Sequence, residues 1–366
     1  MFPQKDVFPQ IAVLVALLLV APAAAQTSPQ AKTQAVRMSM PAFGVQAVVE
    51  VRDLPNAEAE TAVKAALQEI FEIDRLADIA EPAAAEPAAE ATADENAQRP
   101  VPGGVRALNL GAGQGAQAVE PRVAEVLLRS LQFCIWSNGA YGPLGGEIYD
   151  LWGRHQESRP NSQAIYQAVG TAECNRLALN DVTTSSPGER ATLAVGSRVD
   201  LRGIARGFAV DRGHEILREH GVENAWVSVG NVWRASGGGP DGRGWPVSLP
   251  PPPGEKEAID HLWLQDQALV VLSIEPFGGE PFVPVIDQRS GVPAKGVVTV
   301  IVVTEQAVDA EPLAWSLFIF GHREGLMRLG TLEPRPAVFW LLGHGQGEPL
   351  EADYRWTTLQ RVRRGR

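Results

Sequence analysis

Apolar side chains recur along the chain in two different rhythms, and each rhythm predicts a different kind of element. Residues 45–54 alternate apolar and polar side chains, which is typical of a strand. Residues 57–79 instead place apolar side chains three or four positions apart, which predicts a helix. A second helix is predicted from Pro121, because proline suits the first helical turn and apolar side chains follow it at helical spacing.

The second half of the chain is richer in strands. Two helices are predicted among them, over residues 205–220 and 312–320, and Gly221 ends the first. Glycine, proline and aspartate separate the strand-like runs, which are residues 191–201, 224–237, 245–250, 262–274, 281–287 and 296–303. Several of these runs do not alternate, so the sequence predicts an α+β fold whose sheet is partly buried under flanking helices.

Two segments fall outside this pattern. Residues 1–25 carry one lysine, a short apolar stretch and small residues before the predicted cleavage site, which predicts a signal peptide and export to the periplasm or beyond. We expect no transmembrane segment in the mature chain. Residues 80–104 are rich in alanine, proline and glutamate, which predicts a disordered acidic insertion. The rest of residues 26–366 is expected to form one compact domain.

Composition narrows the choice of partners. The chain has 366 residues, a net charge of −11 and a pI near 5.1, which argues against nucleic acid as a ligand. Cys134 and Cys174 lack metal-ligand spacing, so they are either a disulfide or two buried thiols. His214 and His220 lie among charged residues and are expected to be exposed or to cap a helix.

Two segments carry candidate chemistry. Asp200, Arg206 and Asp211 lie close together around two glycines, as either a capped, solvated helix face or part of a site for a charged ligand. Residues 138–153 combine glycines with aromatic side chains, which suits either the close approach of a ligand or a structural corner. The run 111–116 matches the glycine spacing of a dinucleotide-binding fingerprint. The next predicted helix starts too far after the glycines for such a site, so no dinucleotide site is predicted here.

Taken in order, the segments 139–153, 199–231, 245–249, 285–293 and 298–321 resemble the FAD:protein FMN transferase family, the ApbE-like flavin transferases. The resemblance covers residues 37–345 and implies an ApbE/T-fold-like domain. It also implies a Mg²⁺-dependent enzyme with FAD as substrate. Such an enzyme transfers FMN to a Thr or Ser hydroxyl of an exported or membrane-bound acceptor protein and releases AMP.

The resemblance also implies roles for individual residues. Asp200 and Arg206 are the implied catalytic residues, and the Gly203 carbonyl and Glu311 are the implied metal ligands. The residues implied to bind the flavin nucleotide are Met40, Ala140, Tyr141, Gly142, Asp200, Arg206 and Asp287. Asp211 is interpreted as a structural residue or one that supports the site.

Several positions depart from the family pattern. Arg206 replaces a lysine, and Trp315 replaces a metal-binding threonine. Gly142, Leu144 and Pro284 replace an aspartate, a threonine and a histidine. Two alternatives follow from these departures. The chain is either a transferase with an altered site or a catalytically impaired relative that binds flavin or an assembly partner.

Overall fold

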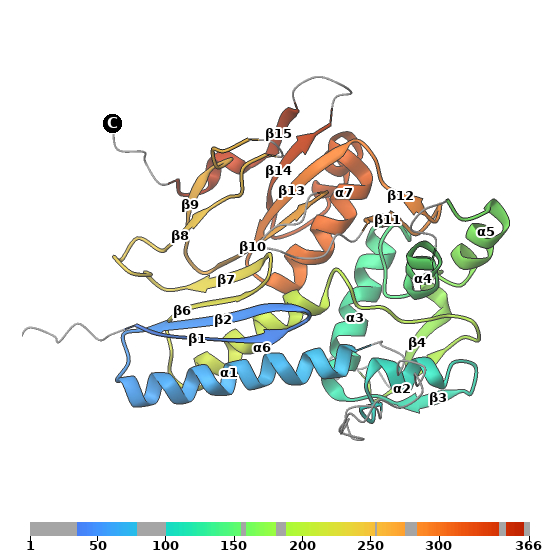
Figure 1. Cartoon of the computed structure of the whole chain (residues 1–366), viewed down its shortest axis with the longest axis horizontal. Helices are drawn as coiled ribbons and strands as arrows, with labels where there is room; N and C mark the ends of the chain where they lie inside the picture. Colours follow the sequence, from blue (N-terminus) through green and yellow to red (C-terminus); the bar gives the residue numbers. More distant parts are fainter. Residues whose placement is uncertain are drawn as a thin grey trace, which may run out of the picture. The chain divides into compact units, whose positions relative to one another are not determined.

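An eight-stranded antiparallel sheet is the main element of the protein, and Figure 1 shows helices covering one of its faces. The computed structural model describes residues 35–78, 100–154, 159–180, 188–252, 255–274, 284–343 and 349–361. In order across the sheet, the strands are β1 (Val36–Ala42), β2 (Val45–Arg52), β6 (Asn224–Val229), β7 (Val232–Ser236), β10 (Gln267–Ser273), β13 (Val297–Thr304), β14 (Ala337–Leu342) and β15 (Leu350–Tyr354).

Both faces of the central strands are buried, which explains why their sequences do not alternate. Helices α1 (Asn56–Ala77), α6 (Ala205–Glu219) and α7 (Ala307–Leu329) pack on one face. Along β10, Ala268 and Val270 belong to the core on the helical side. Leu269 and Val271 belong to a second core on the opposite face, together with residues of the hairpin β8 (Trp245–Ser248) and β9 (His261–Leu264). A strand covered on both sides has no polar face to reveal its period.

A smaller group of elements lies beside the sheet. Its helices are α2 (Val105–Leu110), α3 (Pro121–Trp136), α4 (Gly146–Arg154) and α5 (Ser162–Gly170). Its strands are β3 (Ala116–Ala118), β5 (Arg190–Leu193) and β4 (Leu177–Asn180), with the pair β11 (Ile286–Asp287) and β12 (Val292–Pro293). Two 3₁₀ turns complete the described elements, η1 (Cys174–Arg176) and η2 (Trp356–Thr358).

A disulfide ties this group together. Cys134 near the end of α3 is bonded to Cys174 at the start of η1, with a Cα–Cα distance of 6.0 Å. Of the two alternatives for these cysteines, the structure therefore has the disulfide. The bond closes a loop of 40 residues, and such a loop restricts the unfolded chain.

The predicted α+β class is confirmed, as are the helices α1, α3 and α6, but two boundaries differ. The run predicted as a strand over 191–201 ends at Leu193, because Gly196 adopts a positive φ of 75° and the Ser197 amide donates to the Ala194 carbonyl in a turn. Helix α7 begins before the predicted residue 312 and continues past residue 320 through a kink at Gly321.

Asp211 explains the early start of α7. Its carboxylate accepts hydrogen bonds from the amides of Ala307 at 3.0 Å and Val308 at 2.8 Å, and it pairs with Arg234 at 2.6 Å. These contacts satisfy amides that have no partner within the helix. The interpretation of Asp211 as a structural residue is confirmed.

The predictions for residues 1–25 and for most of 80–104 lie outside the described residues. Residues 101–104 form a turn before α2, in which the Gly104 amide donates to the Val101 carbonyl at 2.9 Å. Among the helices that the structure describes, none combines the length and the apolar character needed to cross a membrane.

Candidate functional site

The loop that carries Asp200 is fastened to the glycine-rich run. The Asp200 amide donates to the Pro143 carbonyl at 2.8 Å. One residue earlier, the Asn109 side chain accepts from the Val199 amide at 2.7 Å and donates to the Val199 carbonyl at 2.9 Å. These contacts bring segments that are far apart in the sequence into one place, as the predicted site requires.

Asp200 pairs with Arg202 rather than with Arg206. Its buried carboxylate, 4% exposed, accepts from the Arg202 amide at 2.9 Å and from Arg202 Nε at 2.8 Å. The Arg202 guanidinium also lies over the Tyr149 ring, 3.9 Å from its centroid. Burial raises the pKa of Tyr149, so the phenol stays neutral although a cation lies next to it.

Arg206 lies in the first turn of α6 and pairs with Glu311 of α7. The Arg206 Nε and Glu311 Oε1 are 3.3 Å apart, and the Gly207 amide donates to Glu311 Oε2 at 2.8 Å. Glu311 is only 1% exposed. Gly207 allows the two helices to approach, because a Cβ at this position would lie 2.3 Å from the Ala307 carbonyl oxygen. One buried carboxylate therefore joins the start of α6 to α7.

The Trp315 indole lies against Gly203, one helical turn after Glu311. A Cβ on Gly203 would lie 2.9 Å from the indole carbons, and Gly203 has a positive φ of 82°. The indole also meets the Tyr149 ring edge-on, with centroids 6.2 Å apart. Trp315 thus packs against Gly203 and against the ring that the Arg202 guanidinium covers.

These residues do not fit a Mg²⁺ ion. Magnesium requires near-octahedral oxygen ligands at about 2.0–2.1 Å. Here both oxygens of Glu311 already accept hydrogen bonds, one of them from a cation, and Trp315 supplies no oxygen where the resemblance places a hydroxyl. Within the described ranges, no group of three or more His, Cys, Asp or Glu side chains could hold a metal ion. The predicted ligands Gly203 and Glu311 do lie in one corner, but an indole and an ion pair occupy it.

The disulfide constrains the glycine-rich run. A Cβ on Gly142 would lie 2.5 Å from Cys134 Sγ, so an aspartate could not take this position without a shift of the disulfide. Ala140 and Tyr141 are buried, and burial raises the pKa of Tyr141 well above its usual value. Leu144 is also fully buried and acts as a core residue.

Gln288 is a residue of this site that the sequence did not reveal. Its backbone amide donates to the Ala140 carbonyl at 3.1 Å, and its side-chain Nε2 donates to the Gly142 carbonyl at 3.0 Å. Its Oε1 is buried, with no hydrogen-bond partner among the residues that the structure describes. The sequence showed only a polar residue in a turn. Its position between Asp287 and Arg289, which mark the turn in the sequence, could have indicated that Gln288 belongs to the site.

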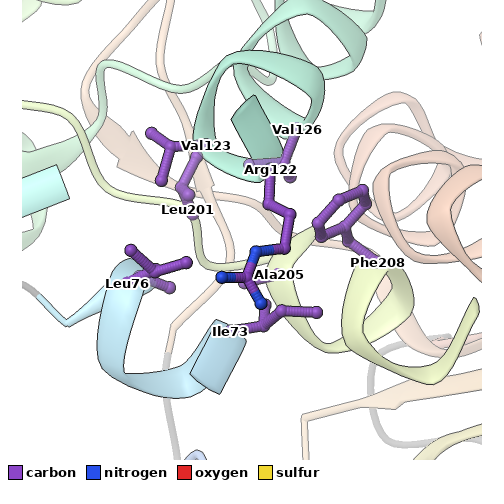
Figure 2. Close-up of a pocket in the computed structure, with 9 residues that line it drawn as sticks. Ile73, Leu76, Arg122, Val123, Val126, Leu201, Ala205 and Phe208 are labelled. Atoms are coloured by element: carbon purple, nitrogen blue, oxygen red, sulfur yellow. The ribbon is translucent and has the colours of Figure 1, made fainter. Parts of the chain in front are cut away.

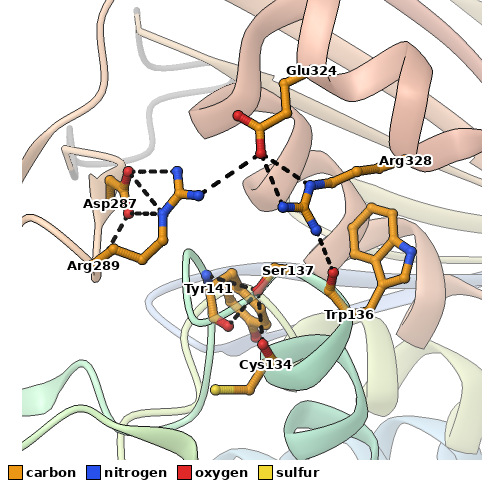
Figure 3. A network of polar contacts seen from close by, with 8 residues as sticks. All are labelled: Cys134, Trp136, Ser137, Tyr141, Asp287, Arg289, Glu324 and Arg328. Atoms are coloured by element: carbon orange, nitrogen blue, oxygen red, sulfur yellow. Dashed lines mark hydrogen bonds and ion pairs between the residues drawn. The ribbon is translucent and has the colours of Figure 1, made fainter.

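Asp287 takes part in a network that reaches α7, as Figure 3 shows. Its carboxylate accepts from Arg289 Nε at 2.9 Å, and Arg289 Nη1 lies 3.8 Å from Glu324. Glu324 pairs with Arg328 at 3.0 Å, and Arg328 donates to the Trp136 carbonyl at 2.7 Å. The turn at Asp287 is thereby connected to both α7 and the end of α3.

Two hollows lie near these elements. The one in Figure 2 lies between α1, α3 and α6 and has a volume of about 10 Å³, which is room for about one water molecule. Its lining is mostly apolar, so it is a packing gap. A wider and more open groove of about 660 Å³ lies along α7 and includes Trp136, Phe320 and Arg328.

The remaining predicted residues are placed as follows. Met40 is half-buried in β1, opposite Ala47. Pro284 is half-buried just before β11. The prediction for His214 was wrong: the residue is half-buried, and its Nε2 is enclosed with no hydrogen-bond partner in the described part of the chain.

The fold and the site together define a class of α+β protein. In this class, an antiparallel sheet supports a site where two helices meet a glycine-rich loop. The ApbE family model matches residues 59–339, and the chain belongs to the ApbE family.

Relatives and solved structures agree with this placement. A FAD:protein FMN transferase of Haemophilus influenzae is 26% identical over 214 residues, which is 56% of this chain and 61% of the relative. One of Treponema pallidum is 27% identical, over 64% of this chain and 69% of the relative. The chain thus spans about three fifths of the length of the Haemophilus protein.

Two solved structures share the fold. The ApbE protein of Thermotoga maritima superposes with a TM-score of 0.71 at 20% identity, covering 90% of this chain and 100% of that one. The flavin transferase ApbE of Vibrio cholerae has a TM-score of 0.68 at 19% identity, covering 88% of this chain and 96% of that one. The predicted ApbE-like fold is confirmed.

Proposed function

We propose that this protein transfers the FMN part of FAD to a Thr or Ser hydroxyl of an acceptor protein and releases AMP. The observation that carries the proposal is the convergence of the Asp200 loop, the glycine-rich run and the start of α6 in one corner of an ApbE fold. The relatives that carry the name FAD:protein FMN transferase support the same reaction.

The reaction exchanges one phosphorus–oxygen bond for another. The acceptor oxygen attacks the phosphorus of the FMN half, and the bond to the bridging oxygen breaks. AMP leaves with the electron pair of that bond, and the hydroxyl proton is lost to solvent or to a base. Negative charge builds up on the phosphates during this step, so fixed cations stabilise the transition state.

Two arginines of the site suit this chemistry. Arg206 and Arg202 are cations within one corner, and each is oriented by a buried carboxylate, Glu311 or Asp200. An arginine fork suits phosphate oxygens in both charge and shape. The glycines of residues 139–146 add less, because Gly142, Gly145 and Gly146 are buried against neighbouring side chains and Gly139 alone among these four is half-buried. We propose this reaction without the Mg²⁺ ion that the resemblance implies, because the corner does not fit that ion.

A second candidate function is favoured by the same misfit. The chain would then hold a flavin nucleotide, or bind an assembly partner, without turning FAD over. The observation in favour is Trp315, whose indole replaces an oxygen ligand with an apolar ring. This alternative predicts bound flavin and no AMP.

The test is incubation of the purified full chain with FAD and a peptide that carries a threonine or serine acceptor. Liquid chromatography would measure AMP, and mass spectrometry would measure the mass of FMN added to the peptide. We expect AMP and flavinylated peptide in equal amounts. Bound FAD without AMP would favour the second candidate, and neither FAD binding nor AMP would refute the transferase proposal.

We further propose that residues 1–25 direct export and that the acceptor lies outside the cytoplasm. The support is the order of charged, apolar and small residues at the start of the sequence. Mass spectrometry of the N-terminus after expression in a secreting host tests this proposal. Cleavage near Ala25 is the expected result, and an intact N-terminus in the exported fraction would contradict it.

A further inference from the structure

The corner formed by Gly203, Arg206, Glu311 and Trp315 holds a positive charge of its own. A guanidinium is permanently protonated, and here its Nε points at a carboxylate that is 1% exposed. The family pattern would place a divalent cation beside the same carboxylate. We propose that Arg206 takes over the electrostatic role of that cation, so that this protein binds FAD without a divalent metal ion. The inference rests on the proposed function.

The hydrogen bonds of Glu311 are the first observation against a metal ion at this carboxylate. Oε1 accepts from Arg206 Nε at 3.3 Å, and Oε2 accepts from the Gly207 amide at 2.8 Å. A metal ion that coordinated either oxygen would have to share that oxygen with one of these donors. Next to Arg206 it would also meet a positive charge at close range, in a partly desolvated place where repulsion is strong.

The volume of Trp315 is the second argument. The indole covers Gly203 so closely that a single added carbon there would lie 2.9 Å from the ring. Magnesium often keeps water molecules where a protein ligand is missing. An indole that is 4% exposed and packed against Gly203 and Tyr149 leaves little room for such water.

The position of Arg206 is the third argument. Its side chain retains 19% of its surface exposed, whereas that of Glu311 retains 1%. The cation is therefore more exposed than the carboxylate that it faces. A guanidinium carries five N–H donors in one plane, and its fork suits phosphate oxygens as well as carboxylates.

The experiment measures metal binding and FAD binding separately on the full chain. Mn²⁺ serves as the metal probe and is followed by electron paramagnetic resonance in the absence of FAD. FAD binding is followed by quenching of flavin fluorescence, once with a chelator and once with excess Mg²⁺. We expect no Mn²⁺ binding that depends on Glu311, and FAD dissociation constants that agree within about twofold in the two conditions.

Variants give the matched comparison. Glu311→Asp combined with Trp315→Thr restores the ligands of the family pattern. We expect it to gain a Mn²⁺ signal and to bind FAD about tenfold more tightly with Mg²⁺ than with the chelator. Trp315→Phe keeps the bulk of the ring without adding an oxygen, and we expect it to stay indifferent to metal. Circular dichroism confirms the fold of each variant.

The outcomes separate the inference from the function on which it rests. The inference is overturned if wild-type protein shows a Mn²⁺ signal that Glu311→Gln removes, or if Mg²⁺ tightens FAD binding by about tenfold or more. These results would leave the proposed function intact. Failure to bind FAD in either condition would instead overturn the proposed function, and the Mn²⁺ measurement would still show whether Glu311 holds a metal. If the double variant does not fold, the wild-type measurements alone decide.

Discussion

Two ion pairs only a few residues apart in the sequence play different parts. Asp200 and Arg202 are two positions apart, and the arginine side chain is 31% exposed. Arg206 and Glu311 are 105 positions apart and join two helices, with the carboxylate fully buried. The first pair orients a loop, whereas the second joins α6 to α7. The comparison shows that charged residues of one short segment can serve a local turn and a distant helix at once.

The largest effect is expected from breaking the second pair. Glu311→Leu leaves a guanidinium and the Gly207 amide without their buried partner, so we expect a loss of about 3–5 kcal/mol in the free energy of unfolding, measured with urea. Adding Arg206→Met to this variant should recover part of the loss. A cost below about 1 kcal/mol for Glu311→Leu would show that the pair does not join the helices.

A methyl group added between α6 and α7 tests the close contact of these helices in a second way. Gly207→Ala places a carbon 2.3 Å from the Ala307 carbonyl oxygen, so α6 and α7 must separate. We expect a loss of about 2 kcal/mol by urea unfolding. The matched control is Gly170→Ala in α5, where an added Cβ meets nothing within 4 Å. It should be neutral or stabilising by up to about 1 kcal/mol, and equal costs at the two sites would contradict the close approach of α6 and α7.

His214 shows what burial on α6 costs an imidazole whose Nε2 has no hydrogen-bond partner among the residues that the structure describes. Burial, helped by Arg234 and Arg218, lowers its pKa from 6.5 to about 3. The unfolded chain therefore binds more protons between these values. The stability is fully present above pH 6.5 and falls by about 1.4 kcal/mol per unit as the pH drops through that range.

Urea unfolding at pH 7 and pH 5 checks this slope. His214→Leu should remove the contribution of about 2 kcal/mol between pH 6.5 and pH 5, whereas His220→Gln, an exposed change at the C-cap of the same helix, should not. Burial raises the pKa values of Glu125 and Asp74, but these groups titrate in all three proteins and cancel in the difference. Identical slopes in wild type and His214→Leu would refute the assignment.

The smallest effect is expected at the first ion pair. Asp200→Asn keeps an acceptor for the Arg202 amide and removes the charge that faces a partly exposed guanidinium. We expect a loss of about 1 kcal/mol, measured by urea unfolding beside Glu311→Leu. If Asp200→Asn cost as much as Glu311→Leu, the distinction between a local pair and a joining pair would fail.

Local periodicity and resemblance predicted much of this fold. The helices α1, α3 and α6 show apolar spacing on one face, so their sequences reveal them without tertiary contacts. The start of α7 could not be predicted in the same way, because it depends on a carboxylate almost a hundred residues earlier, Asp211.

The sequence predicted where the site lies but not which contacts its residues make. Aligning the family pattern placed Gly203, Glu311 and Trp315 near one another, and the structure brings them together. The sequence did not show that Glu311 takes Arg206 as its partner, that Asp200 takes Arg202, or that Gln288 closes over the glycine-rich run. Each of these residues has several possible partners nearby in the sequence or in the family pattern. Only the three-dimensional packing determines which partner it contacts.

The most direct test of the account is a crystal structure of the full chain grown with FAD and Mn²⁺, with diffraction recorded at the manganese edge. We predict flavin nucleotide density beside Arg206 and no anomalous peak at Glu311, whose carboxylate stays paired with the guanidinium. An anomalous peak within coordination distance of the Glu311 carboxylate, with Arg206 turned away, would contradict it.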